Sequence, residues 1–323
     1  MDHGHEIDER NKNNENNCPK AFLHRKRITW TEFKSKKNLK QYIKNKDEQN
    51  LFDRLIKAMG NLTGLLTVKK NNISAPTDRI PGTCFLQGIR RRKTTEKGLK
   101  VQYAIFTFTT VYHLFAENVN DRYVVNKNWK TLDPKVVLFY TPNKSKDSRQ
   151  MKITEMLEAD KDYYVKNDWC AITCECYDVK LIADLENDLA EYQSLQQNLY
   201  LMSKEPAYQD IKLVIIVGHP HGGEKQVSIG RHFPDLKETL KDVRSGQRWC
   251  RYYYDAPTCP GNSGSPVFIF GQPVTGFGYW FGHPHNHAKE ASSIKKIMEK
   301  CKTKPKKDPE CIGMTSIGVE MIV

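Results

Sequence analysis

The sequence lacks any long hydrophobic run. Residues 1–6 lead directly into a polar, asparagine-rich stretch at 11–17, so no signal peptide is expected. No segment approaches the roughly 20 consecutive apolar residues that a membrane-spanning helix needs. We therefore expect no membrane span and an intracellular location, in the cytoplasm or the nucleus.

The sequence also lacks the even, closely spaced cysteines of a disulfide-stabilised secreted domain. Its nine cysteines are an odd number and are scattered, which favours free thiols in a reducing compartment. Cys170, Cys174 and Cys176 are expected to be small core residues of a strand, because their spacing is not the usual arrangement of metal ligands. Histidines at 219–221 and 283–287 are expected in surface loops, and no metal or cofactor is expected.

Acidic residues are too few to balance the basic ones, and the formal net charge is +13. The excess lies in residues 1–60, 88–100 and 286–311, which carry about +5, +5 and +4. The rest of the chain is close to neutral. These basic segments could attract nucleic acid, acidic proteins or anionic lipid, and a solvated surface that binds nothing is the alternative.

The chain is expected to comprise a basic N-terminal segment, 1–60, partly disordered and partly helical, and a larger body, 61–323. A helical pattern runs from Thr31 to Met59, and Gly60 is expected to end it. Apolar side chains at helical spacing predict one long amphipathic helix within the body, through Leu181, Leu185, Leu189, Tyr192, Leu195 and Leu199. Apolar and β-branched segments predict strands at 62–68, 82–86, 136–140, 211–218 and 227–229.

Residues 259–267, Cys-Pro-Gly-Asn-Ser-Gly-Ser-Pro-Val, are the most informative in the chain. Glycines on both sides of Ser263 allow a tight turn. Such a turn can direct consecutive backbone N–H groups at one point while the hydroxyl faces a cleft. Acyl transfer needs both features, a nucleophile and donors for the oxyanion. A plain hairpin turn is the alternative interpretation.

A base and an orienting carboxylate can be sought upstream. Residues 103–112 predict a long buried strand that ends at His113, where the imidazole can enter a cleft. Asp168 opens the short apolar segment 169–173, so its carboxylate can be buried and accept a hydrogen bond from a histidine. Three other aspartates compete for this role: Asp160, Asp162 and Asp178. The first two lie in a polar loop, and the third follows a strand.

These residues give the chain a resemblance to the chymotrypsin/trypsin-like serine proteases. The order His113, Asp168, Ser263 is that of the family, and it differs from the orders in subtilisins and α/β-hydrolases. Separations of 55 and 95 residues are close to the family's layout. Segments 82–86 and 317–321 also match, and the resemblance covers about 62–323. An α/β-hydrolase turn would need glycine where Ser265 stands.

The resemblance implies an all-β fold of two six-stranded antiparallel barrels, at about 61–178 and 207–323, with helical and basic insertions. It implies a serine endopeptidase that hydrolyses peptide bonds in protein or peptide substrates through an acyl-enzyme on Ser263. His113 would be the general base and then the general acid, and Asp168 would orient it. The backbone N–H groups of Gly261 and Ser263 would form the oxyanion hole.

The sequence departs from the family pattern at positions that set activation and specificity. Asn262 stands where the family has an aspartate that pairs with a new N-terminal ammonium, so zymogen-style activation is not expected. Pro257 stands at the base of the first specificity pocket, which favours apolar or aromatic residues before the cleaved bond. Tyr279 and Trp280, in an expected strand at 276–281, are expected in the pocket wall, with barrel core as the alternative.

Two other functions are compatible with the sequence. One is an inactive protease fold that serves as a binding scaffold. The other is a nuclear, DNA-associated protease, since the stretch 218–222, Gly-His-Pro-His-Gly, is similar to one in intracellular trypsin-fold proteases of animals.

Overall fold

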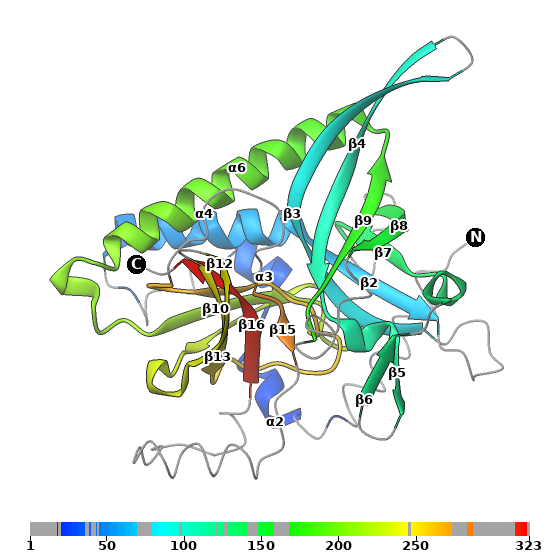
Figure 1. The fold of residues 1–323 in the computed structure, drawn as a ribbon. Helices are drawn as coiled ribbons and strands as arrows, with labels where there is room; N and C mark the ends of the chain where they lie inside the picture. The colour runs from blue at the N-terminus through cyan, green and yellow to red at the C-terminus, as the bar shows by residue number, and fades with distance from the viewer. Residues whose placement is uncertain are drawn as a thin grey trace.

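The computed structural model contains one closed β-barrel. It describes residues 18, 21–35, 39, 43, 45–69, 79–96, 99–119, 122–125, 128–140, 148–157, 168–244, 247–272, 283–286 and 314–321. Six antiparallel strands close the barrel in the order β2-β3-β4-β9-β8-β7 (Figure 1). They are β2 (Thr63–Lys69), β3 (Arg79–Glu96), β4 (Leu99–Thr110), β7 (Lys135–Leu138), β8 (Arg149–Leu157) and β9 (Cys170–Cys176). The first expected barrel is thus present.

The second half of the body forms two four-stranded sheets, so the expectation of a second closed barrel was wrong for the described residues. One sheet has the order β1-β11-β10-β14, built from Ile28–Thr29, Gln226–Arg231, Leu213–Gly218 and Val267–Ile269. The other has the order β12-β13-β16-β15, built from Glu238–Arg244, Gln247–Tyr254, Met314–Met321 and His285–Asn286. Single bridges, His232–Tyr254 and Pro266–Pro284, connect segments that adjoin the two sheets. A closed barrel needs continuous strand pairing, which single bridges do not supply.

Shorter elements connect the strands. They are α2 (Ala21–His24), η2 (Tyr112–Leu114), β5 (Ala116–Val119), β6 (Arg122–Val125), η3 (Trp129–Leu132), η5 (Pro206–Tyr208), η6 (Pro220–Gly222) and η7 (Pro234–Leu236). The strand expected at 276–281 and residues 1–17 lie outside the described residues.

Two helices make the fold mixed, although still rich in β-structure, and so correct the all-β expectation. The helix α6 (Val179–Met202) is the amphipathic helix that the apolar spacing predicts, and all six of its named apolar residues are buried. It runs along the outside of the molecule, beside α4 (Lys46–Leu62) (Figure 1). Asp178 caps the start of α6, where its carboxylate accepts a hydrogen bond from the Leu181 amide (3.0 Å).

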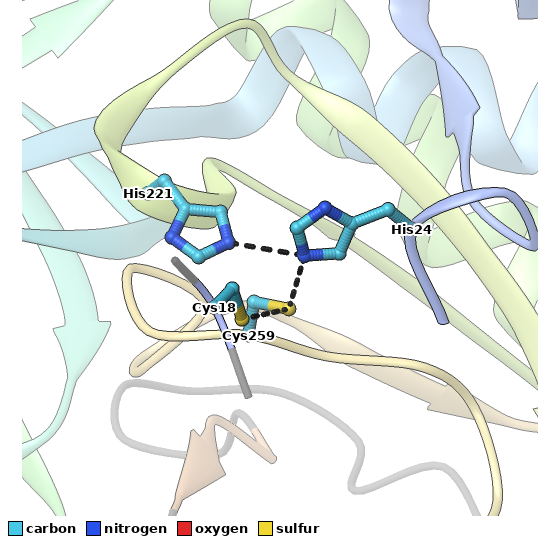
Figure 2. A group of neighbouring side chains, drawn as sticks. All are labelled: Cys18, His24, His221 and Cys259. Atoms are coloured by element: carbon cyan, nitrogen blue, oxygen red, sulfur yellow. Dashed lines mark hydrogen bonds between the residues drawn. The ribbon is translucent and has the colours of Figure 1, made fainter. Parts of the chain in front are cut away.

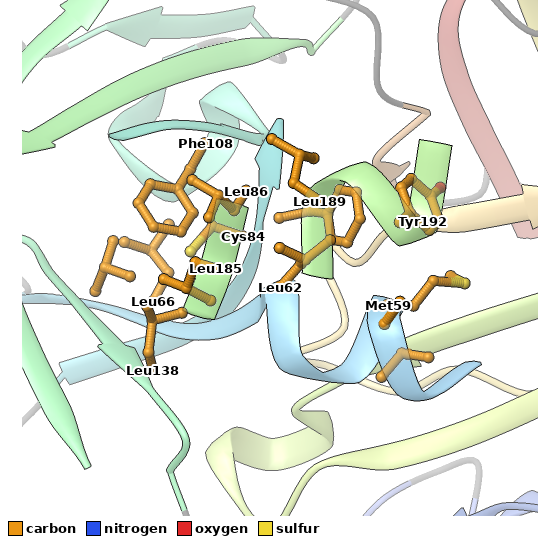
Figure 3. Close-up of a cluster of buried hydrophobic side chains, with 14 of the residues drawn as sticks. Met59, Leu62, Leu66, Cys84, Leu86, Phe108, Leu138, Leu185, Leu189 and Tyr192 are labelled. Atoms are coloured by element: carbon orange, nitrogen blue, oxygen red, sulfur yellow. The ribbon is translucent and has the colours of Figure 1, made fainter. Parts of the chain in front are cut away.

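One hydrophobic core connects the barrel, the two helices and the second half. Figure 3 shows Leu185, Leu189 and Tyr192 of α6 beside barrel residues such as Cys84. The Tyr192 ring packs edge-on against Phe85 of the barrel, with ring centroids 5.1 Å apart. On the other side, Phe52 of α4 contacts Phe268 and Phe270, which follow the serine-containing segment. Both halves therefore share buried apolar side chains.

The helical pattern at 31–59 is divided into two helices, α3 (Trp30–Ser35) and α4. Asn45 caps α4, because its side chain accepts a hydrogen bond from the Asp47 amide (2.8 Å). The expectation that Gly60 ends the helix was wrong, since α4 continues to Leu62. A side chain at Gly60 would overlap the Trp30 ring, so the glycine provides space for the indole.

The cysteines of the barrel are core residues, as expected. Cys84, Cys170, Cys174 and Cys176 are buried, and burial raises the pKa of each thiol. These thiols therefore stay protonated at neutral pH and are poor metal ligands.

The described residues of the basic segment 88–100 belong to β3 and β4, which pair as a long hairpin. The hairpin extends well beyond the barrel (Figure 1). Arg91 pairs with Glu186 of α6 through two hydrogen bonds, from Nε (2.8 Å) and from Nη2 (2.6 Å). Arg90, Arg92 and Lys93 are exposed. Among the described residues, no helix has the length and apolar character that crossing a membrane requires.

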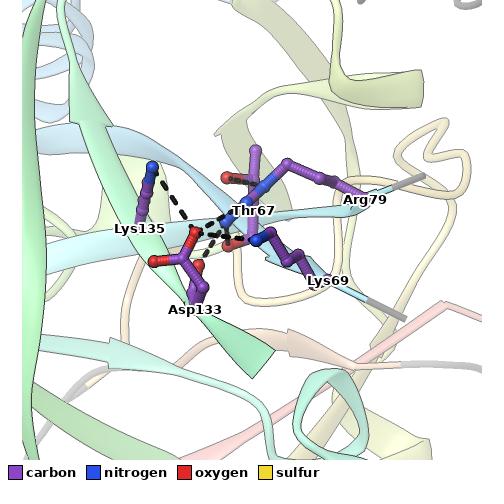
Figure 4. Close-up of polar contacts among 5 residues, drawn as sticks. All are labelled: Thr67, Lys69, Arg79, Asp133 and Lys135. Atoms are coloured by element: carbon purple, nitrogen blue, oxygen red, sulfur yellow. Dashed lines mark hydrogen bonds and ion pairs between the residues drawn. The ribbon is translucent and has the colours of Figure 1, made fainter. Parts of the chain in front are cut away.

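Asp133 follows η3 and forms ion pairs with residues at the ends of three barrel strands, β2, β3 and β7. Its carboxylate pairs with Arg79 (3.2 Å), Lys135 (3.5 Å) and Lys69 (3.6 Å) (Figure 4). Arg79 also donates to the Asp133 carbonyl and to the hydroxyl and carbonyl of Thr67. Burial raises the pKa of Asp133, but the hydrogen bond from Arg79 and the surrounding positive charges outweigh it, and the net pKa is lowered.

We predict that Asp133→Asn lowers stability in a pH-dependent way. Because the folded pKa lies below the ordinary value of 3.8, the charged carboxylate stabilises the protein above that pH and ceases to do so as pH falls through the folded pKa. Urea unfolding at pH 7 should show a loss of about 1 kcal/mol, as is typical of partly exposed ion pairs. The difference from the unchanged protein should disappear in acid. A difference that grows as pH falls would contradict this assignment.

Candidate active site

His113 and Asp168 are held together by two hydrogen bonds. The last residue of β4, Thr110, pairs with Cys170 at the start of β9, which brings the segments that contain the two residues side by side. The Asp168 carboxylate accepts from the backbone N–H of His113 (2.9 Å) and, through its other oxygen, from Nδ1 of the ring (2.7 Å). Because an ionised carboxylate can only accept, Nδ1 donates this hydrogen bond, and in the neutral imidazole the lone pair is then on Nε2, which is buried.

The neighbouring backbone fixes this pair. Asp168 has a left-handed backbone conformation, with φ of 55°, which is uncommon for a residue other than glycine. The next residue, Trp169, is fully buried and packs edge-on against Trp249 of β13. Of the competing aspartates, Asp178 caps α6 as described, and Asp160 and Asp162 lie outside the described residues. Asp168 is thus the aspartate that the structure brings to His113.

Ser263 lies in a compact turn that two glycines make possible. Gly261 and Gly264 have φ of 93° and 89°, a region that other residues rarely adopt. The turn is closed by hydrogen bonds from the Asn262 amide to the Cys259 carbonyl (3.0 Å) and from the Ser265 amide to the Asn262 carbonyl (2.9 Å). Ser263 itself is buried, with 3% of its surface exposed.

Thr83 of the barrel strand β3 holds this turn in place. Its amide donates to the Ser263 carbonyl (2.8 Å), and its hydroxyl donates to the Gly261 carbonyl (2.8 Å). The same hydroxyl accepts from the His219 amide (3.0 Å). One residue of the first half therefore fixes both ends of the serine turn and the loop that packs beside it.

Thr83 also contacts the strand that leads to His113. The hydroxyl of Thr110, three residues before His113, donates to the Thr83 carbonyl (2.8 Å). A side chain at Gly264 would overlap both the Thr83 carbonyl and the Thr110 hydroxyl, so the serine turn touches the end of the histidine strand. The three segments expected to converge, those of His113, Asp168 and Ser263, thus meet at one place.

The peptide group between Pro260 and Gly261 has a defined orientation. Its carbonyl accepts a hydrogen bond from the His221 amide (2.6 Å) in η6. Because N–H and C=O point in opposite directions in a trans peptide, the Gly261 N–H points away from η6. A side chain at Gly261 would meet the His219 carbonyl at 2.5 Å and the His221 amide at 2.7 Å, so η6 packs directly on this glycine.

Asn262 is buried. Its side-chain oxygen accepts a long hydrogen bond from the Ser265 hydroxyl (3.4 Å), and both side chains fill the space beside Gly218. A side chain at Gly218 would overlap them. The serine turn is therefore formed with an amide at the position where the protease family has a carboxylate.

The residues expected in the specificity pocket are only partly described. Pro257 is buried in the segment between β13 and the serine turn. The carboxylate nearest to it in sequence, that of Asp255, accepts a hydrogen bond from the Arg231 amide (2.6 Å). Tyr279 and Trp280 lie outside the described residues.

The expectation that the two histidine-rich stretches are surface loops was wrong. His219, His221, His283 and His285 are all buried. Burial and the nearby Lys225 charge lower the pKa of His219 to about 3, and its neutral ring contacts the Gly223 carbonyl through Nδ1 (3.0 Å). His285 contacts the Tyr254 hydroxyl through Nδ1 (2.7 Å). Proline and glycine next to these histidines suggested loops, but tertiary packing buries them.

The similarity of this chain to known proteins is weak. No protein-family model and no curated protein matches the sequence. Among solved structures, the chain is similar to the active form of the Rv3671c protease from M. tuberculosis, with 10% identity and a TM-score of 0.34 over 79% of this chain and 87% of that chain. Its inactive form gives 11% and 0.32 over 77% and 93%. The chemistry of the site therefore has to follow from its own side chains.

Thr83 is the functional residue that the sequence pattern does not single out. It lies in a strand that resembles the protease family, but a threonine in a strand is ordinary. Only the folded structure shows that its hydroxyl serves two segments far away in the chain.

We predict that Thr83→Val destabilises the protein more than Thr83→Ser. Valine keeps the shape but leaves the buried His219 N–H and Gly261 C=O without their partner, which should cost about 1–3 kcal/mol. Serine keeps the hydroxyl and should recover most of that loss. Urea unfolding of both variants tests this, and equal destabilisation would show that the hydroxyl is not the important group.

Proposed function

We propose that the protein is a serine endopeptidase with Ser263 as nucleophile, His113 as base and Asp168 as the orienting carboxylate. The observation that carries the proposal is the doubly bonded His113–Asp168 pair at the point where the serine turn meets the barrel. A carboxylate that binds both the amide and Nδ1 of one histidine fixes its position and its tautomer. That arrangement leaves Nε2 as the basic atom, which is what activation of a hydroxyl requires.

The reaction follows from these roles. His113 Nε2 takes the proton of the Ser263 hydroxyl as the oxygen attacks the substrate carbonyl carbon, and Asp168 stabilises the imidazolium that results. The N–H groups of Gly261 and Ser263 stabilise the negative oxygen of the tetrahedral intermediate. The imidazolium then gives its proton to the leaving amine, which leaves an acyl-enzyme. A water molecule, deprotonated by the same histidine, releases the acid and restores the serine.

We predict that a fluorophosphonate probe labels the chain on Ser263. Ser263→Ala should abolish labelling, and His113→Ala should nearly abolish it, because the hydroxyl loses its base. Asp168→Asn should slow labelling by about 10⁴-fold, the effect expected when the carboxylate no longer fixes the imidazole tautomer. Mass spectrometry of the labelled peptide should place the adduct on Ser263 rather than Ser265.

A matched control is Ser228→Ala, which removes a buried serine of β11 away from the turn. It should label like the unchanged protein. Labelling that survives Ser263→Ala would refute the nucleophile. A folded, unchanged protein that never labels would favour the alternative function, an inactive protease fold that serves as a binding scaffold.

We further propose that the enzyme cleaves after apolar or aromatic residues. Pro257 offers no charge at the expected base of the first specificity pocket, and the nearby Asp255 carboxylate is bonded to the Arg231 amide. Substrates with phenylalanine, tyrosine or leucine before the scissile bond should be cut at least about 10-fold faster than those with lysine or arginine, since a buried cation without a partner is costly. A peptide library analysed by mass spectrometry measures this, and preferred cleavage after arginine would contradict it.

Intracellular location and attraction of nucleic acid by the basic segments remain predictions. The exposed arginines of the β3–β4 hairpin are compatible with such attraction. Retention on DNA that falls with rising salt would favour the nuclear, DNA-associated form of the protease.

A further inference from the structure

Four potential metal ligands from three distant segments converge beside the serine turn. Cys18 and His24 come from the N-terminal segment, His221 from η6, and Cys259 from the start of the serine turn (Figure 2). Their ligand atoms all lie within 4.8 Å of one another. The two cysteines and His221 are buried, with 3–8% of their surface exposed, and His24 is half-buried.

Three of the six distances between these ligand atoms match the edges of a zinc tetrahedron. The Sγ atoms of Cys18 and Cys259 are 3.7 Å apart, the Cys259 Sγ and His24 Nε2 are 3.3 Å apart, and the two Nε2 atoms of His24 and His221 are 3.4 Å apart. With Zn–S bonds of about 2.3 Å and Zn–N bonds of about 2.05 Å, a regular tetrahedron has edges of about 3.8 Å (S–S), 3.5 Å (S–N) and 3.3 Å (N–N). All three pairs are within about 0.3 Å of these values.

The orientation of the side chains agrees with the distances. The two imidazole rings are inclined at 62° to each other, with both Nε2 atoms directed to the centre of the group (Figure 2). The sulfurs are much further apart than the roughly 2.05 Å of a disulfide. Two thiolates and two neutral imidazoles form a ligand set that is typical of structural zinc.

The backbone around the group is built to hold it. Turns closed by Ala21 N–H to Cys18 C=O (2.9 Å) and by Arg27 N–H to His24 C=O (3.1 Å) fix the N-terminal ligands, and β1 then pairs with β11. His221 has φ of 56°, in the left-handed region where glycine is favoured. An unfavourable backbone conformation that directs a side chain into a cluster of ligands is typical of a functional position.

We propose that Cys18, His24, His221 and Cys259 bind one Zn²⁺ ion, which attaches the N-terminal segment to the loop that carries the oxyanion donors. Cys259 precedes Gly261 by two residues, and the His221 amide binds the Pro260 carbonyl. The ion therefore fixes both sides of the peptide group that orients the Gly261 N–H. This consequence for catalysis rests on the proposed peptidase function, whereas the metal site does not.

The first test is metal content. The full chain, purified under reducing conditions without an affinity tag that binds metals, should contain about one zinc ion per chain by elemental analysis. Cys18→Ser and Cys259→Ser should each lose most of it, and the matched control Cys176→Ser, a buried cysteine at the end of β9, should retain it. Folded, unchanged protein without zinc after exposure to zinc, or zinc retained in Cys18→Ser/Cys259→Ser, would overturn the proposal. A disulfide between Cys18 and Cys259 under these conditions would also overturn it.

Cobalt substitution gives a second, spectroscopic test. Co²⁺ in place of zinc should give the intense visible absorption of a tetrahedral site and a near-ultraviolet band from thiolate ligands. His24→Gln should alter the visible spectrum, because the coordination geometry changes, while His232→Gln, which removes a histidine outside the group, should not. A weak, octahedral spectrum in the unchanged protein would refute a site with two cysteines and two histidines.

The coupling to catalysis is tested separately. Removal of zinc by a chelator should slow fluorophosphonate labelling at least about 10-fold, and added zinc should restore it, because the oxyanion donors lose their support. If the protein binds zinc but is labelled at the same rate after the zinc is removed, the coupling is wrong and the metal site stands. Zinc-loaded protein that never labels would instead overturn the peptidase function and leave the metal site intact.

Discussion

The site depends on the hydrogen bonds that the hydroxyl of Thr83 forms. It bonds the Gly261 carbonyl and the His219 amide at once, while the Thr83 amide bonds the Ser263 carbonyl. The Ser263 turn belongs to the second half of the protein, and the segment that carries His113 belongs to the first. The amide and hydroxyl of Thr83 together bond the turn of one half to a barrel strand of the other.

Local signals in the sequence predict much of this arrangement. Two glycines around Ser263 predict a tight turn, and both have the positive φ that makes glycine necessary. The β-branched segment before His113 predicts a buried strand, and β4 is that strand. The spacing of apolar residues predicts the helix α6, and the side chains on which that prediction rests are all buried. These features are local, because each depends on backbone preference or on the period of the hydrophobic pattern.

Features that depend on distant contacts were not predictable. The division of the helical pattern reflects a local cap at Asn45, but the packing of the Trp30 ring against Gly60 of α4 depends on the tertiary fold. The buried histidines at 219–221 and 283–285 look like loop residues in sequence, since their burial comes from segments far away. The prediction that no metal is bound rested on the spacing of cysteines and histidines within single stretches of the chain. The ligand group combines residues 18 and 24 with 221 and 259, a separation that no spacing rule would find.

Asn262 and the proposed zinc site together suggest a different way of ordering the serine turn from the one in the protease family. In the family pattern, a newly cut N-terminus orders the serine turn by pairing with a carboxylate. This chain has Asn262 at the position of that carboxylate. Here Cys18 and His24 of the N-terminal segment reach Cys259, at the start of the serine turn. The proposed zinc ion would thus support the turn from the N-terminal segment by different chemistry.

The shared core limits how the molecule can move. Phe52 of α4 packs on the strand that follows Ser263, and Tyr192 of α6 packs on Phe85 of the barrel, so no layer of solvent separates the halves there. Rotation of one half against the other, in the manner of a hinge, would expose these aromatic rings to water. In the proposed peptidase, substrate binding would therefore be accommodated by surface loops rather than by separation of the two halves.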